Sequence, residues 1–298
     1  MFMKNNLIPN KAFLGRVSSV IAITLMALAP SIIKLSEMEI FRLIFWRLLV
    51  ASFFYLNLHI FSRRKFSFKE IRISLVGGLV FGFQLILFFS SIRETSVLNA
   101  MVIGSLQPII FLFIATRFFN ERPSRSIYYW SFLSLAGTAL TIQTGREEGV
   151  TSLSGDVLAF FGMLLFCLYF VISKKARTEI DSVPYQLWLT IFALLPVAIA
   201  ALSFGEGLSP PTGEEWLPVL IISLIPGTGH LLQNFAHGHV SLVLMGLINL
   251  LAVAIVPLYA WWLLEEKPGL VQLIGIGIVI GTLAMVVSRP TRQLTGIG

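Results

Sequence analysis

The chain alternates long apolar stretches with short polar connections. Charge-free stretches recur at 73–92, 95–116, 126–145, 182–205 and 216–264. Each is long enough to cross a bilayer, which takes roughly 20 apolar residues in a helix. Backbone amides in lipid must be satisfied within the protein, so serial runs of this length predict helices rather than the ~10-residue strands of a barrel. The predicted fold class is therefore an all-α polytopic integral membrane protein.

Hydropathy and turn signals together predict ten transmembrane helices. The run 216–264 is too long for one span, and the polar, glycine-containing segment 236–239 divides it into two. The predicted helices are 14–34, 39–61, 71–92, 96–119, 125–144, 155–174, 184–204, 214–235, 240–264 and 268–288.

Composition agrees with this class and charge gives it an orientation. Hydrophobic residues make up 56% of the 298 and charged residues only 12%, whereas a soluble domain carries about 25% charged residues. The net charge of +7 is better explained by basic cytoplasmic loops than by a nucleic-acid partner. With a cytoplasmic N-terminus, sixteen of the 22 basic residues lie on the inner side, which also predicts a cytoplasmic C-terminus. The outer six are Lys34, Arg42, Arg47, Arg93, Arg146 and Lys267.

The two halves of the chain share matching residues. Gly15-Arg-Val and Gly155-Asp-Val are 140 positions apart, and Glu121-Arg-Pro and Glu266-Lys-Pro are 145 apart. Further pairs are Lys34 with Lys174 and Ser96 with Ser241. We expect two repeats, 14–144 and 155–289. Because each holds an odd number of helices, the second must be inverted, an arrangement by which carriers expose one midplane site alternately to each side.

Several motifs resemble a known family. The stretch 91–142, with Leu106-Gln-Pro108 and Ala136-Gly137, resembles part of an EamA domain, as does 234–287; Phe45-Trp-Arg47 also fits the pattern. The chain is similar to ten-helix carriers of the drug/metabolite transporter superfamily. The resemblance implies a basket of helices around a central cavity and transport of small metabolites, often export of amino acids or related solutes. The position matching Pro108 in the second half falls at Val253, with Pro257 one turn later.

Ionisable side chains are sparse in the middle of the predicted spans. No Asp or Glu lies there, so a carboxylate proton relay has no candidate. His230 follows Pro226-Gly-Thr-Gly229, which should loosen or break its helix. An imidazole there could contact the solute or couple transport to protons. The alternative is a neutral histidine hydrogen-bonded to a neighbouring helix.

Polar and aromatic residues on other predicted helices complete the candidate site. Gln84 and Phe88 lie one turn apart on one helical face and could meet the polar and apolar parts of one solute. For Gln84 the alternative is an interhelical hydrogen bond, and for Gly77, Gly78 and Gly82 helix packing is the favoured role. The candidate substrate-binding residues are Gln84, Phe88, Asn99, Tyr169, His230, Asn234 and Asn249. The candidate hinges are Pro30, Pro108, Pro226 and Pro257, which each remove an amide donor within a span.

Four further features are interpreted as follows. Arg47 could attract an anionic group of the solute, but a structural anchor at the outer vestibule is favoured. Glu121 and Glu266 are interpreted as helix-end anchors, with coupling as the lesser alternative. Gly277 and Gly281 predict close packing of the last helix. His230, His237 and His239 invite a metal site, but His237 and His239 cannot share one helical face and no acidic or cysteine partner is near.

The sequence thus predicts a secondary transporter that moves a small organic solute, an amino acid or a related compound, most simply outward across a prokaryotic inner (cytoplasmic) membrane. We expect partners limited to the solute and the lipid bilayer, no cofactor, no metal, proton coupling as an option, and a monomer or weak homodimer. The alternatives are a passive facilitator or channel, and a membrane-embedded enzyme built on His230–His239.

Overall fold

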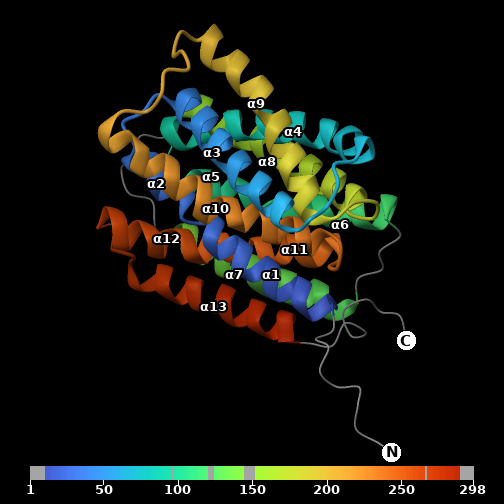
Figure 1. Ribbon diagram of the computed structural model, residues 1–298. Helices are drawn as coiled ribbons and strands as arrows, with labels where there is room; N and C mark the ends of the chain where they lie inside the picture. The colour runs from blue at the N-terminus through green and yellow to red at the C-terminus, as the bar shows by residue number, and fades with distance from the viewer. Residues whose placement is uncertain (1–10, 96, 120–123, 144–151, 266, 289–298) are drawn as a thin grey trace, which may run out of the picture.

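The computed structural model describes residues 11–95, 97–119, 124–143, 152–265 and 267–288, and these residues fold into helices joined by short connections (Figure 1). The α-helices are α1 (Lys11–Met26), α2 (Ala29–Leu35), α3 (Ile40–Phe61), α4 (Phe68–Glu94), α5 (Val97–Gly104), α6 (Gln107–Phe118), α7 (Arg125–Gln143), α8 (Leu153–Ala176), α9 (Ser182–Ser203), α10 (Trp216–His237), α11 (Leu242–Asn249), α12 (Leu251–Leu264) and α13 (Leu270–Ser288), with one 3-10 turn, η1 (Gly213–Glu215).

Within these described residues, eight helical segments are long and apolar enough to cross a membrane. They are Lys11–Leu35, Ile40–Phe61, Phe68–Glu94, Leu153–Ala176, Ser182–Ser203, Gly213–His237, Leu242–Leu264 and Leu270–Val287. Large apolar side chains such as Phe53, Phe132 and Trp262 lie exposed on the outside, as expected where lipid is the solvent. The all-helical membrane fold is confirmed; the ninth and tenth spans, at α5 with α6 and at α7, stay a prediction.

Three of the predicted spans are interrupted partway. The first divides between α1 and α2, and the fourth between α5 and α6. In both, a proline, Pro30 or Pro108, stands in the first turn of the second piece, where its missing amide hydrogen costs nothing. The third interruption lies at Leu250, between α11 and α12, without a proline. There the amide of Leu250 bonds Leu247 O and that of Val253 bonds Leu250 O, each three residues back.

The two interior prolines do not interrupt their helices, and bending at Pro226 and Pro257 stays a prediction. Helix α10 runs unbroken through Pro226, and α12 runs unbroken through Pro257. Pro226 has no amide hydrogen to give Ile222 O, but the neighbouring turns keep the helix intact. The interruption near Pro257 lies instead at Leu250, which matches Ser105 at the 145-residue offset. The second half thus keeps the break of the first half without its proline.

The two halves of the chain are interleaved rather than side by side. Helix α1 packs along α10 of the second half, and α8 packs along α4 of the first; α3 contacts α9, and α7 contacts α13. Figure 1 shows α7 and α13 together along one flank of the molecule. The main helix contacts therefore join the two sequence halves, so a movement of one half relative to the other changes the space between them.

Matching glycines make matching contacts across the halves. A Cβ at Gly15 would lie 2.8 Å from the Cβ of His239, and a Cβ at Gly155 would lie 2.8 Å from the Cβ of Thr95. The first contact is with the connection from α10 to α11, and the second with that from α4 to α5. Each glycine thus lets its helix approach the equivalent connection of the other half.

The two lysines that match between the halves, Lys34 and Lys174, also make corresponding contacts. Lys34 Nζ donates to Thr95 O over 3.2 Å, and Lys174 Nζ donates to Val240 O over 2.8 Å. Thr95 and Val240 are themselves 145 positions apart. Two contacts that correspond by sequence offset therefore recur at the far ends of the two corresponding helices.

Helix α4 lies close against α9 because it carries glycines at the interface, as the small-residue spacing predicts. A Cβ on Gly78 would lie 2.6 Å from Leu189 O, and one on Gly82 would lie 2.7 Å from Ala193 O. The prediction for Gly277 and Gly281 is wrong, since no described atom lies within 4 Å of a Cβ built on either. On that flank α7 makes the close approach, since a Cβ built on Gly137 would lie 2.8 Å from Ile278 Cγ2.

Candidate functional site

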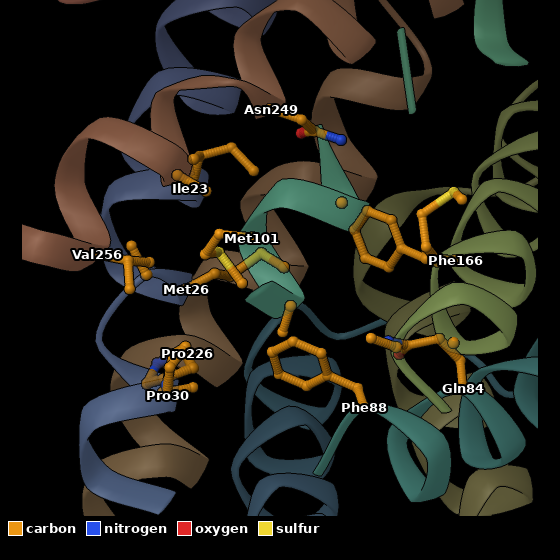
Figure 2. A pocket seen from close by; sticks show the side chains of 18 of the residues that line it. Ile23, Met26, Pro30, Gln84, Phe88, Met101, Phe166, Pro226, Asn249 and Val256 are labelled. Atoms are coloured by element: carbon orange, nitrogen blue, oxygen red, sulfur yellow. The ribbon is translucent and has the colours of Figure 1, made fainter. Parts of the chain in front are cut away.

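A cavity of about 140 Å³ lies in the interior between the two halves. Its lining residues come from α1, α2, α3, α4, α5, α6, α8, α10, α11 and α12. In Figure 2, Phe88, Phe166 and Gln84 stand on one side and Ile23, Met26 and Val256 on the other. The volume is on the scale of cavities that accept one benzene-sized molecule. A small organic solute is therefore the class of ligand that the cavity fits.

Most of the wall is apolar and adaptable. Three methionines, Met26, Met101 and Met163, line it together with the rings of Phe88 and Phe166. Unbranched thioether side chains adapt to ligands of different shape. Sequence reasoning identified Phe88 but missed the methionines and Phe166, because in an apolar helix these residues give the same signal as a side chain facing lipid.

Arg47 lies on the cavity wall. The residue is 2% exposed, and the guanidinium carbon lies 5.8 Å from the ring centre of Phe81 and 5.6 Å from that of Phe89. No described residue accepts a hydrogen bond from its Nε or Nη2. Among the described residues, no carboxylate lies within 4 Å of this charge.

The first turn of α3 is fixed, and this places Arg47. The Glu206 carboxylate accepts hydrogen bonds from the amides of Phe41 and Arg42, 2.6 and 3.0 Å long, so it caps the helix N-terminus where a negative charge is favoured. The Arg42 guanidinium forms an ion pair with Glu215 at 2.6 Å, and Trp46 Nε1 donates to Ser209 O over 2.9 Å. The backbone of Arg47 is held too, since its carbonyl accepts from Ser223 Oγ over 2.9 Å.

Two predicted binding residues also present unpartnered polar atoms. Gln84 is 5% exposed and its Oε1 has no hydrogen-bond donor among the described residues; His230 is 6% exposed and its Nδ1 likewise has no partner there. Both line the cavity. The His230 ring stands edge-on to Phe81 at 4.9 Å, the same ring that Arg47 contacts. Buried polar groups are normally satisfied, so the unpartnered atoms of Arg47, Gln84 and His230 are the polar groups that a ligand in this cavity would meet.

Asn249 lines the cavity and is the centre of a hydrogen-bond chain. Its Nδ2 donates to Gln107 Oε1 over 3.1 Å, and its Oδ1 accepts from Gln233 Nε2 over 3.4 Å. Ser19 Oγ in turn donates to Gln233 Oε1 over 3.1 Å. The chain therefore joins α1, α10, α11 and α6, and it meets two interrupted spans at their interruptions.

Two other predicted binding residues, Tyr169 and Asn234, lie behind the cavity wall and not on it. Both are fully buried. Tyr169 OH donates to Asn234 Oδ1 over 3.3 Å, and Asn234 Nδ2 donates to Gln186 Oε1. Arg177 Nε donates to the Asn234 carbonyl over 2.9 Å. We call Tyr169, Gln186 and Asn234, which connect α8, α9 and α10, the amide cluster.

The remaining candidates are placed as follows. Pro30 and Pro226 line the cavity, as Figure 2 shows, whereas Pro108 and Pro257 do not. The side chain of Asn99, and Glu121 and Glu266 as a whole, lie outside the described part of the structure. His237 packs edge-on against Phe170, and His239 Nδ1 bonds Phe235 O over 2.9 Å. In the described residues no three metal-ligating side chains gather.

Comparison with known proteins gives a consistent picture. A family model, the EamA-like transporter family, matches this chain twice, over residues 12–143 and 153–288. The chain is 26% identical to the uncharacterized transporter YyaM of Bacillus subtilis over 52% of this chain and 54% of that protein, so the match spans about half of YyaM. It is 20% identical to the pseudopaline exporter CntI of Pseudomonas aeruginosa over 73% of this chain and 75% of CntI. A solved crystal structure, 18% identical, covers 92% of this chain and 96% of its own, with a TM-score of 0.72.

Proposed function

This chain belongs to the EamA-like transporter family, and we propose that it is a secondary carrier that moves a small organic metabolite across the membrane by alternating access. The observation that carries the proposal is the interior cavity between the two halves, which holds unpartnered polar atoms of Arg47, Gln84 and His230. A cavity between the two halves with unmet hydrogen-bonding groups fits a bound and released solute.

Repeat-related contacts support an inverted arrangement of the halves 14–144 and 155–289, with ten spans in total. The Lys34 to Thr95 and Lys174 to Val240 hydrogen bonds correspond by offset. In an inverted repeat, corresponding contacts lie on opposite sides of the membrane, so the two halves can exchange conformations around one site. The interruptions at Pro30, Pro108 and Leu250 supply places where the helices can bend.

Unequal packing of corresponding interfaces supports two access states. Gly78 of α4 closely approaches the α9 backbone, whereas the corresponding pair, α10 and α3, is bridged by the longer side chain of Tyr55, whose hydroxyl donates to Gly227 O over 2.7 Å. If the N-terminus is cytoplasmic, Arg47 lies about 10 Å below the outer end of α3 at ~1.5 Å per residue. The amide cluster then lies in the inner half, where it closes the inner route to the cavity.

The proposed solute class rests on the composition of the cavity wall, and the proposed direction of transport rests on the similar proteins. The mostly apolar cavity with a few polar groups fits an amino acid or a related compound. One similar protein is named as an exporter, which favours export, and the similar proteins come from bacteria, which favours a prokaryotic cytoplasmic membrane. Coupling to protons at His230 is part of this proposal and is tested below.

Uptake by the purified protein in proteoliposomes tests the function. Labelled amino acids, a nucleoside and a polyamine are offered over a range of concentrations, with and without an imposed pH gradient. A carrier must saturate with at least one solute class, whereas a passive channel conducts in proportion to concentration. Linear, non-saturating flux would therefore replace the carrier with a facilitator of the same fold.

A further inference from the structure

The buried guanidinium of Arg47 lacks a counter-charge in the described structure. It is 2% exposed, and neither its Nε nor its Nη2 has a hydrogen-bond acceptor. Phe81 and Phe89 lie at cation–π distance, which eases the burial of charge. A ring face does not replace the oxygen acceptors that the guanidinium N–H groups require. The cavity that Arg47 lines is therefore the place where an acceptor must come from.

Other arginines near the helix ends show what a structural anchor looks like in this protein. Arg42 binds Glu215, and Arg93 Nη2 donates to the carbonyls of Ser36 and Met38. Arg177 donates to the carbonyl of Asn234. Each of these side chains fastens two segments together through oxygen acceptors. Arg47 fastens none through its side chain, so the anchor role does not account for it.

We propose that Arg47 binds a carboxylate of the transported solute, an inference that rests on the proposed carrier function. The planar guanidinium matches a carboxylate in a two-point geometry. A carboxylate is favoured over phosphate because Arg47 is the one Lys or Arg among the described lining residues, and a phosphate dianion would need more positive charge than a single arginine supplies.

The rest of the cavity specifies the remainder of that solute. The unpartnered Oε1 of Gln84 is an acceptor, so it suits an N–H or O–H donor of the solute. Phe88, Met101 and Phe166 supply apolar surface for a hydrocarbon body. The geometry therefore points to a small amphiphilic monocarboxylate with an N–H or O–H donor group, and an apolar amino acid, whose ammonium supplies such a donor, is one example.

Matched ligand pairs test this inference by thermal unfolding of the full-length protein in detergent. The probes are phenylalanine, leucine and methionine, each compared with its amide, which keeps the apolar body and loses the carboxylate. We expect at least one acid to bind about tenfold or more tightly than its amide, because a hydrogen bond to a charged group contributes at least that factor. Equal binding of acids and amides, or no binding of any acid, would overturn the inference.

Three variants separate a ligand role from a structural one. Arg47→Met should abolish the preference for the acid while melting at the same or a higher temperature, because it removes an uncompensated buried charge. Arg47→Lys should keep part of the preference, and Arg72→Met, at an exposed arginine of α4, should keep all of it. An Arg47→Met protein that retains the preference would overturn the inference.

Transport assays distinguish this inference from the carrier function itself. Saturable uptake with no distinction between acids and amides would leave the carrier intact and remove the carboxylate site. Preferential binding of acids without any uptake would keep the carboxylate site and remove the carrier function.

Discussion

Asn249 Nδ2 donates a hydrogen bond to Gln107 Oε1 over 3.1 Å, and this bond ties two interrupted spans together where each is interrupted. Gln107 begins α6 and Asn249 ends α11. Both side chains line the cavity. The bond therefore connects the site to the points at which the helices can bend.

This relationship predicts measurable coupling between the two amides. The Gln107→Ala and Asn249→Ala variants should each lower the stability of the protein, and the double variant should lose about 0.6 kcal/mol less than the sum, the typical value for an interhelical hydrogen bond in a membrane. Thermal or denaturant unfolding in one detergent measures the cycle. Strict additivity of the two losses would show that the bond contributes nothing.

The close approach of α4 to α9 predicts sensitivity to a single methyl group. Gly78→Ala should destabilise the protein by about 1–3 kcal/mol, the usual cost of overpacking, because the new Cβ would lie 2.6 Å from Leu189 O and the backbone cannot yield. Gly277→Ala is the matched control, since open space surrounds it, and its effect should stay within about 0.5 kcal/mol. Equal effects of the two substitutions would refute the interface.

Cys167, the single cysteine of the chain, reports on closure beside the amide cluster. It is 2% exposed and lies on α8 two residues before Tyr169. Asn234→Ala removes two interhelical hydrogen bonds worth about 0.6 kcal/mol each, so maleimide labelling of Cys167 should rise roughly sevenfold. Asn57→Ala is the control, because that exposed amide bonds Phe53 O of its own helix. Unchanged labelling in Asn234→Ala would exclude the cluster as a closing element.

Proton coupling at His230 predicts a selective defect. His230→Gln should lose most of the stimulation of uptake by a pH gradient while it retains saturable uptake without one, because glutamine keeps a polar group at the cavity but cannot carry a proton. His239→Gln, at a histidine bonded to Phe235 O outside the cavity lining, should behave like the native protein. Full gradient dependence in His230→Gln would assign coupling elsewhere.

Much of the fold follows from hydrophobic pattern and turn chemistry. Apolar run length predicts the helical segments, and Pro30 and Pro108 predict two interruptions. The interruption at Leu250 carries no such signal, because neither proline nor glycine stands at positions 247–253, where the amides of Leu250 and Val253 each bond a carbonyl three residues back. The unbroken path of α10 through Pro226 is likewise not signalled, because proline within a span predicts a bend or break as readily as a continuous helix.

The sequence predicts which polar residues lie near the candidate site, but not which of them line the cavity and which lie behind its wall. Gln84, His230 and Asn249 stand out because amides and imidazoles are rare in apolar helices. Periodicity cannot separate a cavity-facing side chain from one that faces another helix, so it predicts Tyr169 and Asn234 as binding residues although both lie behind the wall. For Arg47, the distance from a helix end predicts the depth of the residue but does not show that its side chain lines the cavity.

Counterflow is the measurement that decides between a carrier and every alternative. Proteoliposomes loaded with a high concentration of an unlabelled apolar amino acid should transiently accumulate the labelled compound from outside above its equilibrium level, because one cavity opens alternately to the two sides. The overshoot should be abolished in Arg47→Met. Simple equilibration without an overshoot, for a solute that the protein conducts, would contradict alternating access.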